Sequence, residues 1–207
     1  MTAAEPAPPR GRPRSEKARL AVLQAAADLL LEDGLPAVSM DAVAARAGVS
    51  KATIYRWWPT KETLALDALY QEWAAVPVPR DTGSLRGDLL SLLRPWVRQA
   101  GRRPYGRAIA ALVTAAQADP EFARTYRARF VEPRREQARV ILRRAIERGE
   151  IPASTKIEVA LDLLYGPVYH RLLHGHAPLN DRFIRDVIDT TLGGILPPAP
   201  PAAPPAG

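Results

Sequence analysis

Cysteine is absent from the 207-residue chain, which excludes disulfide bonds, thiolate metal sites and a cysteine nucleophile. The apolar runs all fall well short of the roughly 18 residues that a membrane-spanning helix needs. The first residues also lack the apolar core of a secretory signal peptide. We therefore expect a soluble, cytoplasmic protein without a membrane partner.

Lysine is scarce, since only four of the 29 basic residues are lysines and the others are arginines. The formal net charge is +7, but it is unevenly distributed. Residues 1–80 carry ten basic and nine acidic groups, whereas residues 81–207 carry 19 basic and 13 acidic groups. Total charge therefore does not locate a nucleic-acid-binding segment.

Strand signals are scarce too, because the sequence has no alternating β-branched runs and no hairpin dipeptides. Apolar residues recur at helical spacing instead, which predicts an all-α fold of about nine helices. Breaks or bends are expected near Pro95, at Pro133 and at Gly166-Pro167, since proline removes a helical N–H. The expected helices cover residues 15–33, 39–48, 50–58, 60–76, 84–100, 105–118, 120–148, 155–174 and 180–195.

Residues 39–58 carry the pattern that says most about function. Two helices too short to be stable alone are joined by Ala47-Gly48-Val49-Ser50. Gly48 supplies the positive φ that a tight turn between helices requires. The two helices share an apolar contact formed by Val43, Ala47, Val49 and Ile54. The segment predicts a helix-turn-helix, which presents its second helix to the major groove of DNA.

The exposed positions of the second helix suit contacts with DNA. Its N-terminal N–H groups favour phosphate, Thr53 and Ala52 suit thymine methyl groups, and Lys51 suits guanine or phosphate. Read singly, Tyr55 and Trp58 could be core residues, and the lysines could be solvated surface. The predicted DNA-contacting residues of this helix and the start of the next are Ser50, Lys51, Ala52, Thr53, Tyr55, Arg56, Trp57 and Lys61.

The stretch from Ala25 to Leu64 resembles the DNA-binding domain of the TetR/AcrR family of bacterial transcriptional regulators. The resemblance rests on AAADLLLEDG, VSMDAVAARAGVS and KATIYRWWPTKETL. It implies base contacts by Lys51, Ala52 and Thr53, and a buried Trp58. It also implies contacts to the DNA backbone by Ser39, Met40, Tyr55, Trp57 and Lys61. Trp57 departs from the family, in which smaller polar or imidazole side chains are common at this position.

The predicted organisation has four parts. Residues 1–14 form a disordered basic arm and residues 15–60 the helix-turn-helix domain, which we expect to contain three helices. Residues 61–196 form a helical bundle for ligand binding and dimerisation, where the resemblance is much weaker. Residues 197–207 form a disordered tail rich in Pro and Ala.

The arm contains Arg10-Gly11-Arg12-Pro13-Arg14, which resembles the core of an AT-hook. Extended arginines such as Arg12 and Arg14 suit a narrow, A·T-rich minor groove, where negative potential is concentrated. An arginine arm that adds only non-specific affinity fits the sequence equally well.

Two helices near the C-terminus are apolar on more than one face, and in the family the last two long helices form a four-helix dimer interface. The resemblance therefore implies a homodimer that binds a palindromic operator in double-stranded DNA. A helix buried in a larger bundle is the alternative. The apolar positions are Ile157, Val159, Leu161, Leu163, Leu164, Val168 and Leu172 in the first helix, and Phe183, Ile184, Val187, Ile188 and Leu192 in the second.

Many regulators of this family bind a ligand in an apolar cavity of the C-terminal domain. The resemblance implies a sequence-specific repressor that a small apolar or amphipathic inducer releases from DNA by a population shift. The sequence does not name the inducer, and residues of this kind at helical spacing are more often ordinary core than cavity wall. The candidate wall residues are Trp96, Tyr105, Leu112, Phe122, Tyr126, Phe130, Tyr165 and Tyr169.

The alternatives to a DNA-binding regulator have little support in the sequence. His170, His174 and His176 are spaced for Zn²⁺, but they lack the acidic residue of the metalloprotease pattern. No Gly-rich phosphate loop, paired-carboxylate motif or Ser–His–acid signature is present. We expect no enzymatic activity, no cofactor and no metal. A helical enzyme or metal-dependent protein using the C-terminal cavity is the alternative, as is an architectural DNA-binding protein, which would not need so large a C-terminal domain.

Overall fold

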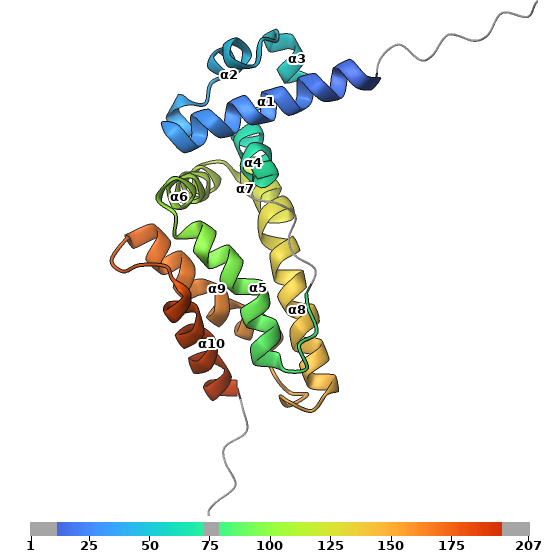
Figure 1. Ribbon diagram of the computed structural model, residues 1–207, viewed down its shortest axis with the longest axis vertical. Coiled ribbons are helices and arrows are strands. Elements are labelled where there is room, and N and C mark those ends of the chain that lie inside the picture. The colour runs from blue at the N-terminus through green and yellow to red at the C-terminus, as the bar shows by residue number, and fades with distance from the viewer. Residues whose placement is uncertain (1–11, 73–78, 196–207) are drawn as a thin grey trace, which may run out of the picture. The chain divides into compact units, whose positions relative to one another are not determined.

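The computed structural model describes residues 12–72 and 79–195, and all regular structure in these ranges is helical (Figure 1). The all-α prediction is confirmed. Taking the uninterrupted run from α7 to α8 as one, the described residues contain nine long or short α-helical runs, as expected. The elements are α1 (Arg12–Glu32), the 3-10 turn η1 (Leu35–Ala37), α2 (Met40–Ala47), α3 (Lys51–Tyr55), α4 (Lys61–Glu72), α5 (Leu85–Ala100), α6 (Arg103–Ala118), α7 (Pro120–Tyr126), the π-helical η2 (Arg127–Val131), α8 (Glu132–Glu147), α9 (Ile157–His174) and α10 (Asp181–Ile195).

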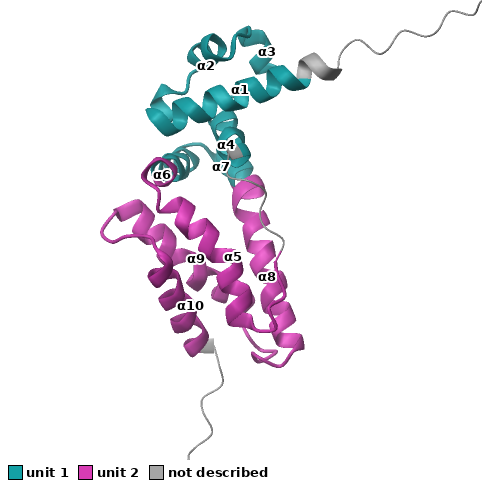
Figure 2. Cartoon of the chain, viewed as in Figure 1, with its two compact units in different colours: residues 1–75, 107–126 teal, residues 76–106, 127–207 magenta. Residues whose placement is uncertain are grey.

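The chain divides into two compact units (Figure 2). The first comprises residues 1–75 and 107–126, and within it α1 packs against α2 and α4. The second comprises residues 76–106 and 127–207, and within it α5 packs against α8 and α10. In this division α4 groups with the helix-turn-helix, whereas the sequence predicts a boundary after residue 60. That boundary, as a functional one, stays a prediction.

Helix α1 begins at Arg12, three residues before Ser15, where the sequence analysis began it. Arg12, Pro13 and Arg14 therefore form the first helical turn and do not continue an extended arm. Proline is compatible with this turn, because the first N–H groups of a helix have no partner within it. The disorder predicted for residues 1–11 and 197–207 lies outside the described residues, as does the predicted end of the fourth helix.

Helix α5 runs through Pro95 without the break that the sequence analysis expected there. The loss of one backbone hydrogen bond is outweighed by burial, since Leu92, Leu93, Trp96 and Val97 are all at most 6% exposed. Helix α9 likewise continues through Pro167. Tertiary packing here overrides the local preference of proline.

The break predicted near Pro133 takes the form of a π-helical segment, η2, which precedes α8. Pro133 stands in the first turn of α8, where its missing N–H costs little. Phe130, inside η2, is buried, and its carbonyl accepts a hydrogen bond from Arg134 Nη1 at 2.8 Å. The guanidinium of Arg134 also lies 3.8 Å from the centre of the Phe130 ring. These contacts stabilise the wider turn.

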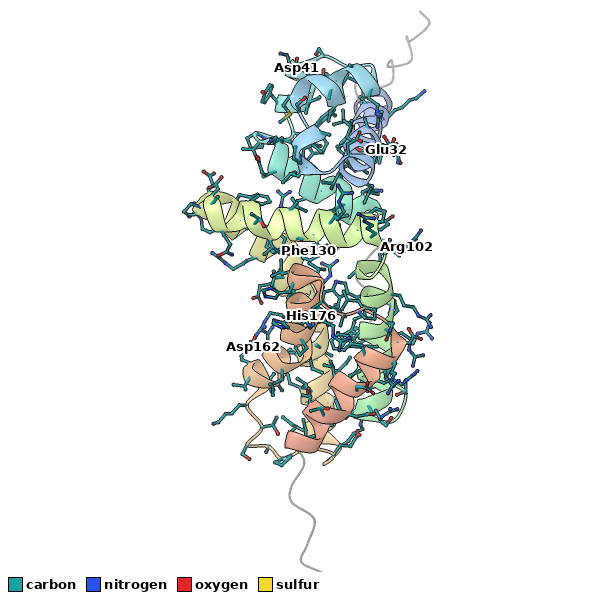
Figure 3. All side chains as sticks on the ribbon, turned by 90° about the vertical axis from the view of Figure 1, so that its left-hand side faces the viewer. Glu32, Asp41, Arg102, Phe130, Asp162 and His176 are labelled. Atoms are coloured by element: carbon teal, nitrogen blue, oxygen red, sulfur yellow. The ribbon has the colours of Figure 1, made fainter. Side chains whose placement is uncertain are left out.

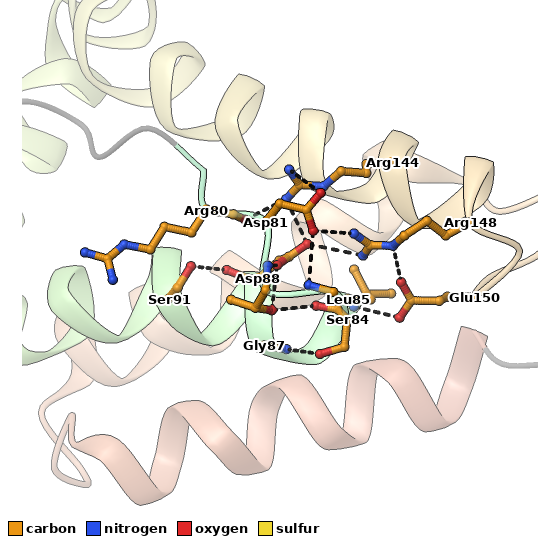
Figure 4. Close-up of polar contacts among 12 residues, drawn as sticks. Arg80, Asp81, Ser84, Leu85, Gly87, Asp88, Ser91, Arg144, Arg148 and Glu150 are labelled. Carbon is orange, nitrogen blue, oxygen red and sulfur yellow. Dashed lines mark hydrogen bonds and ion pairs between the residues drawn. The ribbon is translucent and has the colours of Figure 1, made fainter.

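The second unit contains one fully buried carboxylate, that of Asp88 in the first turn of α5 (Figure 4). The backbone N–H and hydroxyl of Thr82 donate to its Oδ1 at 2.6 and 2.7 Å. Arg144 of α8 and Arg148, the residue after this helix, donate to Oδ2 at 2.8 and 3.2 Å. Burial raises the pKa of Asp88, but these four donors outweigh it and hold the pKa below its ordinary value. Asp88 therefore ties α5 and residues 79–84 to the end of α8.

A second ionic cluster joins α8 to α9. Arg135 donates to Asp162 at 2.6 Å and to Glu158 at 2.7 Å, and Arg139 donates to Glu158 at 2.7 Å and also to Glu136. The hydrogen bonds from Arg139 and Arg135 lower the pKa of Glu158 to about 2. Because both arginine side chains are at most 18% exposed, their charges depend on these carboxylates as counter-ions.

We expect Asp88→Ala to lower the free energy of unfolding by about 3 kcal/mol, because it removes the acceptor of the two Thr82 donors and one of the acceptors of Arg144 and Arg148 inside the unit. Denaturant unfolding followed by circular dichroism measures the loss. Asp186→Ala is the matched control, since its pair with Arg182 spans 3.9 Å and its side chain is 66% exposed. The control should cost less than about 1 kcal/mol. Equal losses for the two variants would contradict the central role of Asp88.

The low pKa of Glu158 predicts a particular dependence of stability on pH. A carboxyl group whose pKa is lower in the folded state stabilises the fold above its ordinary pKa of 4.5, and this contribution is lost as the pH falls towards about 2. Glu158→Gln should therefore be less stable than the parent at pH 7, and the difference should shrink as the pH falls from 5 to 3. Thermal unfolding at several pH values measures it. A difference that does not vary with pH would refute the assignment.

Candidate nucleic-acid interface

Helix α2 begins and ends on the residues that the sequence predicts. The hydroxyl of Ser39 accepts a hydrogen bond from the Ala42 N–H at 3.1 Å, which caps the first turn. Gly48 ends the helix at φ 67°, in the left-handed region, and its N–H donates to the Ala44 carbonyl. Since a side chain at this φ is strained, glycine is the residue that the turn between α2 and α3 requires.

Helix α3 has only five residues, and its shape depends on its surroundings. The Ser50 hydroxyl accepts from the Thr53 N–H at 3.3 Å and lies 3.0 Å from the Thr53 hydroxyl. Ile54 is fully buried and Trp58, just after the helix, is 3% exposed. Trp58 Nε1 donates to Asp67 of α4 at 2.8 Å. A cap at one end and two buried side chains at the other therefore hold α3 in place.

The structure places most of the predicted DNA-contacting residues on one exposed segment around α3. Thr53, Trp57 and Lys61 are half-buried, and Met40 is 8% exposed, so that its side chain offers little surface to DNA. Arg12 and Arg14 lie in the first turn of α1, and their side chains are outside the described residues. The exposed residues are Ser39, Ser50, Lys51, Ala52, Tyr55 and Arg56.

Two ion pairs in this unit were not anticipated from the sequence. Lys51 Nζ lies 2.9 Å from Asp41 Oδ1, so the first turns of α3 and α2 are joined by opposite charges. The hydrogen bond and the charge of Asp41 raise the pKa of Lys51. Arg46 of α2 donates to Glu32 of α1 at 2.9 Å. The signal for the first pair was present in the sequence, since both residues stand one or two positions after a predicted helix cap.

Trp57, the residue that departs from the family pattern, lies against other side chains of the same segment. Its ring centre is 5.7 Å from that of Trp58, in an edge-to-face arrangement. The Arg56 guanidinium lies 5.6 Å from the Trp57 ring centre. These contacts restrict the Trp57 side chain, as edge-to-face pairs and cation–π contacts do.

The second unit contains a pocket with a volume of about 320 Å³ between α8 and α9. Of the eight wall residues that the sequence analysis named, Tyr165 and Tyr169 line it. Trp96 is buried behind them, with its ring centre 5.3 Å from Tyr165 and 5.9 Å from Tyr169. The full lining is Val131, Arg134, Arg135, Asp162, Tyr165, Gly166 and Tyr169.

The other five predicted wall residues do not line this pocket. Phe130, in the second unit, is buried and directly precedes the lining residue Val131 in the sequence. Tyr105 is half-buried. The three that remain belong to the first unit, and all are buried: Leu112, Phe122 and Tyr126. Phe122 and Tyr126 lie against each other, with ring centres 6.3 Å apart.

The polar groups of the pocket walls are held by other protein groups. The Tyr165 hydroxyl donates to the Arg134 carbonyl at 2.9 Å, and burial raises the pKa of Tyr165. Arg134 donates to the Phe130 carbonyl, and Arg135 donates to Asp162 and Glu158. What the walls offer a ligand is therefore mainly apolar: the tyrosine rings, Val131 and the backbone at Gly166.

The three histidines near the end of α9 are close together. The ring centre of His170 lies 4.7 Å from that of His174 and 4.9 Å from that of His176. In residues 12–72 and 79–195, however, no group of three or more His, Cys, Asp or Glu side chains is arranged to hold a metal ion. In the same ranges, no helix is long and apolar enough to cross a membrane.

Comparison with known families gives two matches that together cover most of the chain. Residues 22–68 match the family of bacterial regulatory proteins named after TetR, and residues 79–191 match the tetracycline-repressor-like C-terminal domain. The chain belongs to the TetR family. The segment that carries α2, α3 and the start of α4 is therefore the N-terminal helix-turn-helix of a transcriptional regulator.

Relatives of this TetR-family regulator extend over nearly its whole length. It is 43% identical over 187 residues to the HTH-type transcriptional regulator YdeS of Bacillus subtilis, covering 90% of this chain and 93% of YdeS. It is 33% identical over 180 residues to the DNA-binding transcriptional repressor TetR of Mycobacteroides abscessus, covering 86% and 94%. The crystal structure of the TetR-family regulator SCO0332 matches with a TM-score of 0.73 and 38% identity, over 87% of this chain and all of that one. These relatives are regulators of transcription.

Proposed function

We propose that this TetR-family protein is a cytoplasmic, dimeric repressor that binds a palindromic operator and is released by a small apolar ligand. The observation that carries the proposal is the exposed N-terminal turn of α3, which presents Lys51, Ala52 and Thr53 beside the capping Ser50. This is the end of a recognition helix that meets base edges in the major groove.

The division of roles within the interface follows from side-chain chemistry. Ala52 and the Thr53 methyl group suit thymine, and Lys51 suits the O6 and N7 acceptors of guanine. Ser39, Tyr55, Arg56, Trp57 and Lys61 surround these three and would bind the sugar-phosphate backbone. Met40 would contribute mainly its backbone N–H at the start of α2, because its side chain is buried.

The basic residues of the first turn of α1 add a further contact in this proposal. Because Arg12 and Arg14 lie in the first helical turn, only residues up to Gly11 remain for an extended segment in the minor groove. We assign to Arg12 and Arg14 contacts with phosphate next to the half-site, which raise affinity for any sequence.

The dimer interface is assigned to α9. Val159, Leu163 and Leu173 are 56%, 48% and 47% exposed, and with Gly166 and His170 they form a stripe along the helix at spacings of four, three, four and three. Helix α10 offers no such stripe among its described side chains. Its large apolar residues Phe183, Ile184, Val187 and Ile188 are buried, Leu192 is half-buried, and its exposed face carries charged and small residues. A partner would therefore cover the apolar face of α9 and meet polar groups of α10 at the rim.

The effector is assigned to the pocket between α8 and α9. A pocket of about 320 Å³ is at the lower end of the range for small-molecule sites. Since its polar groups are already hydrogen-bonded within the protein, a compact, uncharged ligand that stacks on Tyr165 and Tyr169 fits it best. Such a ligand would lower affinity for DNA by favouring a conformation that binds the operator less well.

The operator is tested by selecting bound duplexes from a random DNA pool with purified protein at near-physiological salt. We expect an enriched palindrome whose half-sites are about one helical turn apart. Thr53→Ala should bind this operator roughly fivefold more weakly and leave binding to scrambled DNA nearly unchanged, because it removes one base contact. Thr114→Ala, which removes an exposed hydroxyl from α6, serves as a control. Equal weakening on both duplexes would contradict a base-reading role for Thr53.

We expect Leu163→Glu to convert the dimer to a monomer, because it places a charge in the centre of the α9 stripe. Sedimentation velocity measures the mass, and operator binding should weaken in parallel. Val140→Glu is the matched control, since Val140 is an apolar residue of α8 that is 42% exposed and lies off the stripe. A Leu163→Glu variant that remains dimeric would place the interface elsewhere.

A further inference from the structure

The reading surface of the helix-turn-helix carries a carboxylate, that of Asp41. Its side chain is 77% exposed and lies at the outer edge of the first unit (Figure 3). Its Oδ1 is 2.9 Å from Nζ of Lys51, a residue that is itself 53% exposed and that we assign to base contact. The carboxylate is thus already the ion-pair partner of a lysine that would otherwise be available to DNA.

The fold has little need of a carboxylate at this position. The first turn of α2 is already capped by the Ser39 hydroxyl, which accepts from the Ala42 N–H. An exposed acidic group in the first turn adds only a small stabilisation to a helix that is already capped. An exposed ion pair likewise contributes little to stability, because water screens both charges. The position of Asp41 therefore points to an effect on binding.

A negative charge at this place opposes binding to DNA in general. The start of α2 is a helix N-terminus, which attracts phosphate. Asp41 lies in this first turn and beside Lys51, so its charge repels the phosphates that this N-terminus and Lys51 attract. Any duplex that binds must either leave the pair with Lys51 intact, and accept this repulsion, or replace the carboxylate as the partner of Lys51.

We propose that Asp41 is a specificity-determining residue. It pairs with Lys51 in the absence of DNA and lowers the affinity for DNA that offers this lysine no replacement acceptor. The inference rests on the proposed reading of DNA by α3. On an operator whose guanine O6 and N7 face Lys51, these two atoms accept hydrogen bonds from its ammonium group and compensate for the loss of the ion pair. On other sequences Lys51 stays with Asp41, and the repulsion lowers affinity without compensation.

The test compares Asp41→Asn with the parent on two duplexes, the selected operator and a scrambled sequence of the same composition, over a series of salt concentrations. On the scrambled duplex we expect affinity about two- to fivefold higher, as the scale of an exposed ion pair implies. The slope of log K against log salt should steepen by about one unit, because the released Lys51 adds a phosphate contact. The ratio of operator to scrambled affinity should fall.

Two further variants separate the ion pair from total charge. Asp33→Asn changes the net charge of the same unit equally, at a position just after α1, and should raise affinity for both duplexes by the same small factor. In a Lys51→Ala background, Asp41→Asn should no longer steepen the salt slope, because the lysine it would release is gone. Thermal unfolding of each variant confirms that the unit remains folded.

The possible outcomes are distinct. An Asp41→Asn variant that matches Asp33→Asn on both duplexes would overturn the proposal, as would one that binds both more weakly than the parent. A parent protein that prefers neither duplex would contradict the proposed sequence-specific reading. In that case the scrambled-DNA affinity and its salt slope still decide whether Asp41 restrains Lys51.

Discussion

A helix of five residues does not keep its shape in water, and everything that α3 offers to DNA depends on what fixes it. Three contacts do so: the Ser50 cap at its start, the buried Ile54 near its end, and the hydrogen bond from Trp58 to Asp67 just beyond its end. The cap is local to α3, but the other two contacts depend on neighbouring elements, so α3 is only as well positioned as the helices it packs against. The left-handed backbone conformation of Gly48 determines the direction of α3 relative to α2.

The helices of the second unit are held in place mainly by buried and half-buried charges. Where the first unit relies on caps and apolar contacts, the second places the Asp88 carboxylate in its interior and surrounds it with four donors. A buried charge is costly unless all of its lone pairs are used, so the arrangement tolerates few alternatives. The ionic cluster of Arg135, Arg139 and Glu158 then fixes α9 to α8 along the same edge that bounds the pocket. The charged wall residues Arg135 and Asp162 are thereby paired with protein groups, and the rest of the lining is mainly apolar.

Local chemistry made the helix-turn-helix predictable from the sequence. Ser39, Gly48 and Ser50 each act on residues within four positions, so their pattern already contains the geometry that the structure shows. Pro95 and the pocket walls were harder, because their outcome depends on residues far away in the chain. Pro95 stays inside a helix since its neighbours are buried by distant helices, and a buried aromatic residue such as Phe122 has the same spacing as one that lines a cavity. The pair of Lys51 and Asp41 lies between these cases: it is local in space, but ten positions and a turn separate its members.

The residues assigned to base contact are already engaged in the free protein, Lys51 with Asp41 and the Thr53 hydroxyl with Ser50. Binding to DNA therefore exchanges one set of partners for another, and affinity reflects the difference between the two sets. Such an exchange lowers affinity least where the DNA supplies equivalent partners and most where it supplies none. Since a genome offers a vast excess of non-specific sites, weakening non-specific binding more than operator binding increases occupancy of the operator. The internal contacts of α3 therefore contribute to sequence specificity more than to affinity. A DNA-binding surface on which every donor were free would bind DNA tightly but with low sequence specificity.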